Sequence, residues 1–296
     1  MVRLARVSRH LDESPADRGL RGVIALATAI VLTGCATTAA PRTPTAEVTA
    51  NPSATGVLIA LPPTAGAPDY QLGGAYEPAE GVQTVARDRT DPPVEWLYSI
   101  CYVNAFQTQP GESGEWPDEL LLRDAEGEPV IDPDWPDEVI VDTRDAEAVA
   151  AVVAPWIEGC ADDGFNAVEF DNLDTYTRTD GVLSREDNVA VATLLVRAAH
   201  GAGLAAGQKN AAEDAAVLHS EAVFDFAITE ECAAYDECSA YTDVYGDAVI
   251  GIEYTDNLPV PFAEVCAQPD RPASLVLRDR DLTTPGDPAY VFELCR

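Results

Sequence analysis

Carboxylate side chains crowd into two short segments of this 296-residue chain. Glu169, Asp171 and Asp174 fall within six residues, and Glu230 and Glu231 follow about sixty residues later. When carboxylates from two segments meet, an ionised one can attack an anomeric carbon or activate a water, while a protonated one donates to the leaving oxygen. The spacing is therefore typical of glycosidase chemistry.

Other kinds of reactive site are not supported by the sequence. The three histidines, His10, His200 and His219, are scattered, and none lies near a serine in a hydrolase motif. Clustered metal ligands are also missing, so we expect no metal site. With 51 Asp and Glu against 18 Lys and Arg, the formal charge of −33 argues against nucleic acid as a partner. A cationic ligand is compatible with that charge.

Apolar segments alternate with helical patterns along the chain, which predicts a parallel α/β sheet. The eight expected strands are 81–86, 96–103, 139–141, 166–170, 204–208, 223–229, 248–252 and 274–277. Expected helices include 145–157 with a stop at Gly159, a capped helix from Ser184 to about His200, and shorter ones at 210–219 and 261–266. Eight such units favour a (β/α)8 TIM barrel over a doubly wound open sheet, because no glycine-rich phosphate loop is present.

Polar residues gather where the expected strands end. They are Asp88, Asn104, Asp142, Asp171, Asn172, Lys209, Asn210, Glu230, Glu253 and Asp279, and Lys209 is the only lysine in the chain. In a barrel the carboxyl ends of the strands meet at one face, where catalytic groups are found.

The N-terminal residues predict export and a lipid anchor. Residues 1–34 combine a basic stretch with a short apolar run, as in a secretory signal. Leu32-Thr33-Gly34-Cys35 resembles a bacterial lipobox, in which Cys35 is lipidated. Residues 35–65 are rich in Ala, Thr and Pro and are expected to be a linker, which leaves 66–296 as one barrel domain. We expect the protein to face outward from the bacterial cell membrane, attached by that lipid.

Six further cysteines, an even number in an exported protein, indicate disulfides. They allow fifteen pairings. Cys232 and Cys238 are close enough to pair locally, in which case Cys266 with Cys295 and Cys101 with Cys160 would follow.

Several ordered motifs together resemble glycoside hydrolase family 114. They are GFNAVEFDNLDTY, AGQKN, FDFAITEECAAYDEC and IEYT, with YQLGG, ICYVN and VLRDRDL at matching places, and they span about residue 67 to the end. The resemblance implies a TIM barrel with the activity of an endo-α-1,4-polygalactosaminidase. The resemblance also implies that this activity needs no metal or organic cofactor.

The same resemblance assigns roles to individual residues. Asp171 matches the nucleophile and Glu230 the acid/base, although the adjacent Glu231 leaves open which glutamate is catalytic. Glu231 should also raise the pKa of its neighbour, as a general acid requires. Asn172, Lys209 and Asn210 match polar positions of the cleft, and Asp142, Tyr102, Glu253 and Tyr254 are candidate sugar contacts.

Two functions follow as hypotheses. The first is a lipid-anchored hydrolase that cuts internal α-1,4 bonds of a galactosamine-rich, possibly cationic polysaccharide with retention. Retention requires carboxyl groups about 5–5.5 Å apart, whereas about 6.5–9.5 Å fits inversion. The second is a surface lipoprotein that binds carbohydrate on the same barrel without turnover.

Overall fold

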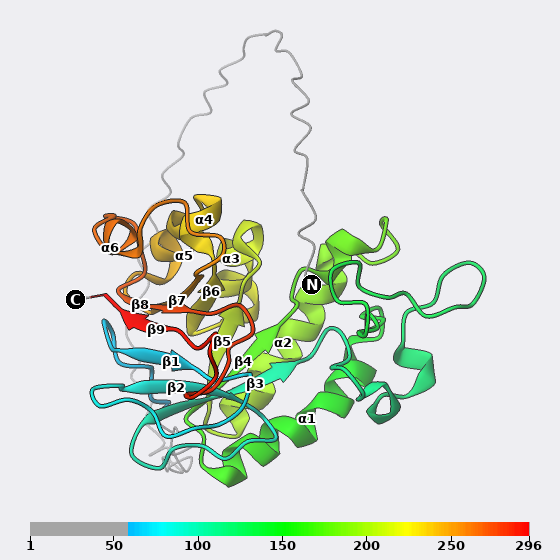
Figure 1. The fold of residues 1–296 in the computed structure, drawn as a ribbon. Coiled ribbons are helices and arrows are strands. Elements are labelled where there is room, and N and C mark those ends of the chain that lie inside the picture. Colours follow the sequence, from blue (N-terminus) through cyan, green and yellow to red (C-terminus); the bar gives the residue numbers. More distant parts are fainter. Residues whose placement is uncertain (1–58, 296) are drawn as a thin grey trace, which may run out of the picture. The chain divides into compact units, whose positions relative to one another are not determined.

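A computed structural model describes residues 59–295, and these form a barrel-like sheet with helices outside it (Figure 1). Eight strands lie side by side in chain order and run parallel, and a ninth pairs antiparallel with the eighth. The strands are β1 (Pro68–Tyr70), β2 (Thr84–Asp88), β3 (Tyr98–Asn104), β4 (Ala167–Asp171), β5 (Ala205–Lys209), β6 (Phe226–Glu230), β7 (Val249–Tyr254), β8 (Ser274–Arg278) and β9 (Phe292–Leu294). The expected (β/α)8 barrel is confirmed.

An arginine at the end of β8 joins the first and last parallel strands. The Arg278 guanidinium donates to the carbonyl oxygen of Tyr70 and pairs with the Asp69 carboxylate at 3.1 Å. The side chains of Arg278 and Asp69 are both fully buried. Because a buried guanidinium needs hydrogen-bond acceptors, this pair holds β1 beside β8.

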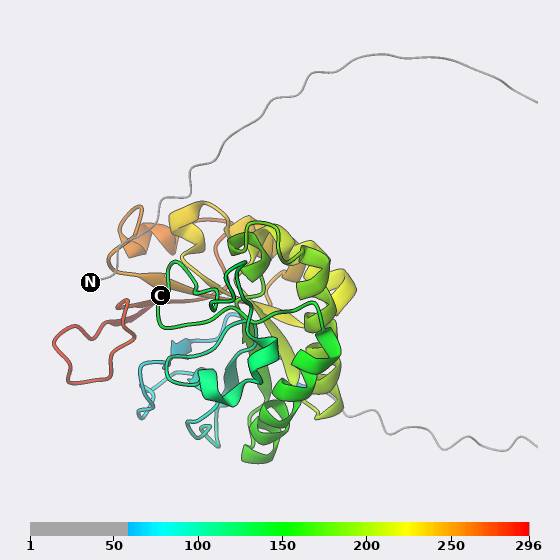
Figure 2. The same ribbon diagram turned by 90° about the vertical axis from the view of Figure 1, so that its right-hand side faces the viewer.

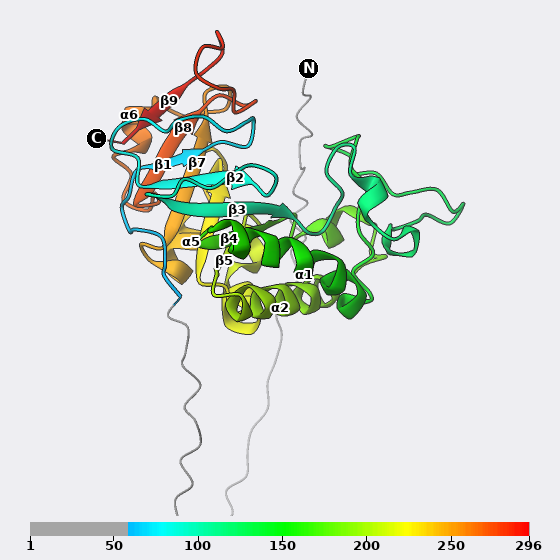
Figure 3. The ribbon, with the colours of Figure 1, turned by 90° about the horizontal axis from the view of Figure 1, so that it is seen from below.

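The helices lie in the connections after β3 to β7. They are α1 (Ala146–Asp163), α2 (Arg185–Gly201), α3 (Ala215–Val217), α4 (Cys232–Tyr235), α5 (Cys238–Tyr245) and α6 (Phe262–Val265). Figure 3 shows α1 and α2 side by side against the same part of the sheet. No helix within residues 59–295 is both long and apolar enough to cross a membrane.

Helix termini follow local signals, with one correction. The capping box at Ser184 and Asp187 is present, so α2 starts where we expected. The expected stop of α1 at Gly159 is wrong, because the helix continues to Asp163. It ends at Gly164, which takes the left-handed conformation at φ 96° that terminates helices.

Two strand assignments also need correction. Residues 139–141 form only isolated bridges, to Gln107, Leu121 and Ile131. They belong to an insertion, residues 105–145, that follows β3 and contains two short turns of 3₁₀ helix, Ser113–Glu115 and Asp118–Leu120. Figure 2 looks toward the carboxyl ends of the strands, and the insertion lies in front of them. The first strand of the barrel is instead β1, a three-residue segment too short for the apolar pattern to mark.

Side chains alternate between two cores. Ile100, Ala167, Ala205, Phe226 and Ile252 belong to the cluster inside the barrel. The residues between them, such as Val168 and Ala206, pack in a second cluster with the helices. The interior is narrow, since a Cβ on Gly207 would lie 2.6 Å from the Phe226 ring. The parity of a residue, meaning its odd or even place along the strand, therefore decides whether its side chain reaches the mouth of the barrel.

The segment before the barrel makes contacts of its own. Ile59 packs against the interior cluster, and the Tyr98 hydroxyl donates to the carbonyl oxygen of Ala60 at 2.7 Å. The expected linker had extended to residue 65. Cys35 and the expected signal segment lie outside the described residues.

Three disulfides join parts of the barrel domain. They are Cys101–Cys160, Cys232–Cys238 and Cys266–Cys295, the pairing that follows from a local Cys232–Cys238 bond. Cys101–Cys160 ties β3 to α1 across the insertion, and Cys266–Cys295 fixes the chain beyond β9.

The loop that each disulfide closes predicts its contribution to stability. Replacing both cysteines of Cys101–Cys160, 59 residues apart, by alanine should lower the free energy of unfolding by about 4 kcal/mol. The same change at Cys232–Cys238, six residues apart, should cost about 2 kcal/mol. Urea denaturation measures both, and a larger loss from the short loop would contradict the chain-entropy account.

Candidate active site

Three neighbouring strands end in ionisable residues. Asp171 is the last residue of β4, Lys209 of β5 and Glu230 of β6. Side chains on one face of a strand recur every two residues. Ala167, Gly207 and Ile228 face the interior, so Asp171, Lys209 and Glu230 lie on the same face of their strands. Strand order and parity together bring these three side chains to the mouth of the barrel.

The ammonium of Lys209 lies between the two carboxylates. Its Nζ donates to Oδ2 of Asp171 at 3.2 Å and to Oε2 of Glu230 at 2.8 Å. The Lys209 side chain is only 2% exposed. Burial alone would lower the pKa of Lys209, but the negative charges of Asp171, Glu230 and Glu169 raise it above its usual value. Lys209 therefore stays charged.

This shared donor limits the separation of the carboxylates. The two oxygens lie 3.2 Å and 2.8 Å from one nitrogen, so they cannot be more than about 6 Å apart. Two N–H bonds that diverge at the tetrahedral angle place the oxygens about 5 Å apart, since each bond points at its acceptor.

Asp171 accepts hydrogen bonds on both of its oxygens. The Tyr102 hydroxyl, from β3, donates to Oδ2 at 2.9 Å, and the backbone N–H of Asn172 donates to Oδ1 at 2.8 Å. Burial and the charge of Asp171 raise the pKa of Tyr102 well above its usual value, so this hydroxyl remains a donor. The Asp171 side chain keeps 15% exposure at the mouth.

Glu230 is held by three donors. Besides Lys209, Nδ2 of Asn210 donates to Oε2 at 3.1 Å, and the Tyr254 hydroxyl donates to Oε1. The Asn210 side chain in turn accepts from the backbone N–H of Glu230 at 2.8 Å. This reciprocal pair fixes the carboxylate relative to its own backbone.

The expectation that the pKa of Glu230 is raised is wrong. Burial acts in that direction, but the charge of Lys209 and the hydrogen bonds from Lys209, Tyr254 and Asn210 lower the pKa below its ordinary value of 4.5. The sequence analysis had expected the charge of Glu231 to raise this pKa, but Glu231 forms an ion pair with Arg280.

Glu231 turns away from the pair. Both of its oxygens accept from the Arg280 guanidinium at 2.7 Å, and Nδ2 of Asn257 donates to Oε1 at 2.9 Å. This bidentate geometry gives a strong ion pair. Of the two adjacent glutamates, only Glu230 faces Asp171 and Lys209.

The same backbone turn follows each of the three strand-end residues. Asn172, Asn210 and Glu231 have φ of 63°, 53° and 62°, in the left-handed region. Asparagine adopts this region more readily than most residues, whereas glutamate pays a conformational cost. The ion pair with Arg280 offsets that cost at Glu231.

Two buried groups beneath the pair, Glu169 and Tyr70, were given no place in the site by the sequence analysis. Glu169 is fully buried two residues before Asp171, so it faces the same way, and the Tyr70 hydroxyl donates to it at 3.3 Å. Burial raises the pKa of Glu169 to about 8, despite the opposing charge of Lys209. The two-residue period of a strand could have identified Glu169.

A third missed residue, Glu138, comes from the insertion. It is 8% exposed and accepts from Nδ2 of Asn104 at 3.1 Å and from Nε2 of Gln107 at 2.5 Å. Burial, with a contribution from the charge of Asp171, raises the pKa of Glu138 to about 7. No periodicity in the sequence marks it, because the insertion has no regular structure.

Of the expected site residues, two lie away from the pair. Glu253 is one residue out of phase with Tyr254, and its Oε1 accepts from the backbone N–H of Ala233 at 2.9 Å on the outer side of β7. Asp142 forms its ion pair with Arg144. Tyr102, Asn172, Lys209, Asn210 and Tyr254 all contact Asp171 or Glu230.

One grouping of metal-ligand types occurs among residues 59–295. It consists of Cys232, Cys238 and Glu253, whose ligand atoms lie within 4.8 Å of one another. The two sulfurs are bonded to each other, so they are not thiolate ligands.

Known proteins resemble this chain in sequence profile and in fold. The sequence profile of Glycoside-hydrolase family GH114 matches residues 48–296. Ega3 of Aspergillus fumigatus, solved in complex with galactosamine, is 21% identical, with a TM-score of 0.64 over 79% of this chain and 96% of that one. The glycoside hydrolase domain of PelA from Pseudomonas aeruginosa is 14% identical, with a TM-score of 0.52 over 75% and 97%. At these identities the likeness is one of fold. No curated protein sequence matches the chain.

The raised carboxyl pKa values predict an unusual dependence of stability on pH. Glu138, Glu169 and Glu253 move from 4.5 to about 7, about 8 and about 7 on folding, chiefly through burial. Between those limits the native state binds more protons than the unfolded state, so the free energy of unfolding falls as pH rises from about 4.5 to 8. Calorimetry should give a lower Tm at pH 8 than at pH 5.

Glu253→Gln is the matched variant, because its amide oxygen can still accept from Ala233 and it lies away from the pair. It should flatten the fall in Tm. A Tm that rises between pH 5 and pH 8 in the unaltered protein would contradict these shifts.

Proposed function

Because this chain belongs to glycoside-hydrolase family GH114 and is a glycoside hydrolase, we propose that it cuts internal α-1,4 bonds of galactosamine-containing polysaccharide with retention. In this proposal Asp171 is the nucleophile and Glu230 the acid/base. The observation that carries it is the Lys209 ammonium, which donates to both carboxylates at once.

The geometry favours retention over inversion. Retaining enzymes hold their carboxyl groups about 5–5.5 Å apart, and inverting enzymes about 6.5–9.5 Å apart to admit a water. Oxygens of Asp171 and Glu230 share one nitrogen at 3.2 Å and 2.8 Å, which agrees with the shorter range.

Asp171 is arranged for attack. Lys209 donates to its Oδ2, and the Asn172 N–H and Tyr102 hydroxyl fix its orientation. As an Asp171 oxygen bonds to the anomeric carbon, the glycosidic bond breaks and its oxygen takes a proton from Glu230. The products are a glycosyl ester on Asp171 and the released chain with a new hydroxyl.

Glu230 then acts as the base. Its carboxylate takes a proton from a water that attacks the anomeric carbon, the ester bond to Asp171 breaks, and both carboxyl groups return to their starting states. Since Lys209 lowers the pKa of Glu230 in the free protein, the protonated acid grows in abundance as pH falls. We therefore place the activity on the acidic side of neutrality.

Several observations support an amino sugar as substrate. The chain carries a formal charge of −33, which attracts a polymer with free ammonium groups. Ega3, similar in fold, has been solved with galactosamine. With the expected signal segment and lipidated Cys35, the enzyme would act on such a polymer outside the cell, held to the membrane by lipid.

The test is reducing-end release from partially deacetylated α-1,4-galactosaminan. Residues 59–296 should release ends from internal bonds, and Asp171→Asn should reduce kcat at least about 10³-fold without loss of binding, since the isosteric amide cannot attack. A β-1,4-linked glucosamine polymer is the linkage control. Binding without release in the unaltered protein would contradict the hydrolytic proposal and favour a carbohydrate-binding lipoprotein.

The two adjacent glutamates can be separated by substitution. Glu230→Gln should lower kcat by about 10²–10⁴-fold, because it removes the proton donor. The deficit should shrink with a leaving group of low pKa, which needs no proton. Glu231→Gln should stay within about tenfold, since a glutamine still hydrogen-bonds Arg280. Equal losses in the two variants would contradict the assignment of Glu230.

A further inference from the structure

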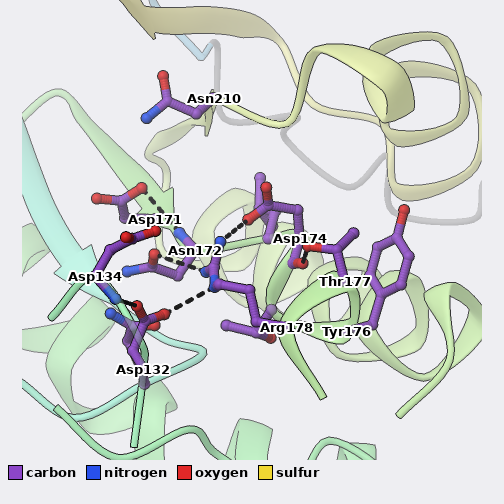
Figure 4. Close-up of polar contacts among 12 residues, drawn as sticks. Asp132, Asp134, Asp171, Asn172, Asp174, Tyr176, Thr177, Arg178 and Asn210 are labelled. Carbon is purple, nitrogen blue, oxygen red and sulfur yellow. Dashed lines mark hydrogen bonds and ion pairs between the residues drawn. The ribbon is translucent and has the colours of Figure 1, made fainter. Parts of the chain in front are cut away.

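Arg178 connects the insertion to the nucleophile strand. It lies in the 3₁₀ turn Thr175–Arg178 after β4, and its guanidinium meets three partners from two segments (Figure 4). Nε pairs with the Asp132 carboxylate at 2.7 Å, Nη1 donates to Asp174 at 3.0 Å, and Nη2 donates to Oδ1 of Asn172 at 3.2 Å. Its side chain is 20% exposed, whereas that of Asp132 is 1% exposed.

A directed chain of hydrogen bonds starts at this arginine. Because a guanidinium only donates, Asn172 must present its Oδ1 to Arg178, which leaves its Nδ2 free to donate on the other side. That Nδ2 donates to Oδ1 of Asn104 at 3.1 Å, and Nδ2 of Asn104 donates to Oε2 of Glu138 at 3.1 Å. The chain thus runs from a cation to a carboxyl group with every amide dipole aligned, which strengthens each bond.

The middle of this chain touches the nucleophile. The backbone N–H of Asn172 donates to Oδ1 of Asp171 at 2.8 Å, in a residue whose φ is 63°. Its side chain is held at both ends, by Arg178 and by Asn104, which restrains the residue that carries this N–H. The insertion supplies both outer anchors, Asp132 beside Arg178 and Glu138 beside Asn104.

We propose that Arg178 is a positioning residue, which acts through Asn172 and Asn104 to couple the insertion to the orientation of Asp171. The proposal rests on the nucleophilic role of Asp171 proposed above. We call this chain of hydrogen bonds from Arg178 through Asn172 and Asn104 to Glu138 the relay. Its members Arg178, Asn104 and Glu138 do not need to touch substrate. Removing either end of the relay frees the side-chain amide of Asn172. The backbone N–H of Asn172 then shifts and loses its hydrogen bond to Oδ1 of Asp171.

The kinetic test compares variants at the two ends of the relay. Arg178→Met and Glu138→Leu each remove an end, and each should lower kcat about 30–100-fold with KM changed less than about threefold, because misorientation costs rate more than binding. Glu138→Gln keeps an oxygen acceptor for Asn104 and Gln107, so it should recover most of the kcat that Glu138→Leu loses.

Arg123→Met is the matched control. Arg123 also belongs to the insertion, pairs with Asp118 and donates to the carbonyl oxygen of Gly127 at 3.0 Å, and has no bond to the relay. Its kcat should stay within about threefold of the unaltered protein. Equal kcat in Arg178→Met and Arg123→Met, a loss confined to KM, or equal damage from Glu138→Gln and Glu138→Leu would overturn the proposal.

A readout without substrate separates this proposal from the catalytic one. In hydrogen exchange followed by NMR, Arg178→Met should speed exchange of the Asn172 backbone amide at least about tenfold relative to Arg123→Met, while amides of β6 keep their rates. If the unaltered protein releases no reducing ends but this difference appears, the substrate assignment fails and the relay stands. An Asn172 amide that exchanges equally in both variants overturns the relay, whatever the activity. Should Arg178→Met not fold, Glu138→Leu against Glu138→Gln gives the same comparison.

Discussion

A buried ammonium shared by two carboxylates is the interaction on which the rest of the site depends. Lys209 is almost excluded from water, so its charge must be compensated by groups within hydrogen-bonding distance. Asp171 and Glu230 provide that compensation and are thereby held a few ångströms apart. Removing either carboxylate would leave a buried charge with half of its compensation. Structural stability and the spacing that glycoside chemistry requires are set by the same contact.

The barrel supplies this contact through strand order. Three consecutive strands, β4, β5 and β6, lie side by side, and each ends in one ionisable side chain in phase with the interior. A left-handed turn follows each of them and carries the chain away from the mouth. Tyr102 from β3 and Tyr254 from β7 complete the ring of donors. The ion pair between Arg280 and Glu231 places a positive charge beside this further negative one.

Much of this arrangement was predictable from sequence, because it depends on local patterns. Alternating apolar segments indicated the barrel, polar residues at strand ends indicated its active face, and the single lysine fell among them. Parity could also have excluded Glu253 and identified Glu169, since a strand places neighbours on opposite faces. The short β1 carried too little signal. The insertion was misread as a strand at 139–141, because its position depends on contacts between distant residues, such as Arg178 with Asp132. The pKa of Glu230 depended on the same kind of contact, with Lys209, Tyr254 and Asn210 from other segments supplying the charge and the hydrogen bonds that lower it.

A nucleophilic Asp171 must lie within bonding distance of a sugar held beside Glu230. Mass spectrometry of the Glu230→Gln protein treated with α-galactosaminyl fluoride tests it most directly. Fluoride leaves without a proton donor, and the missing base slows hydrolysis of the ester, so one galactosaminyl group should accumulate on the peptide that contains Asp171. Adduct on another residue, or folded protein that turns over the fluoride without any adduct, would contradict a nucleophilic role for Asp171.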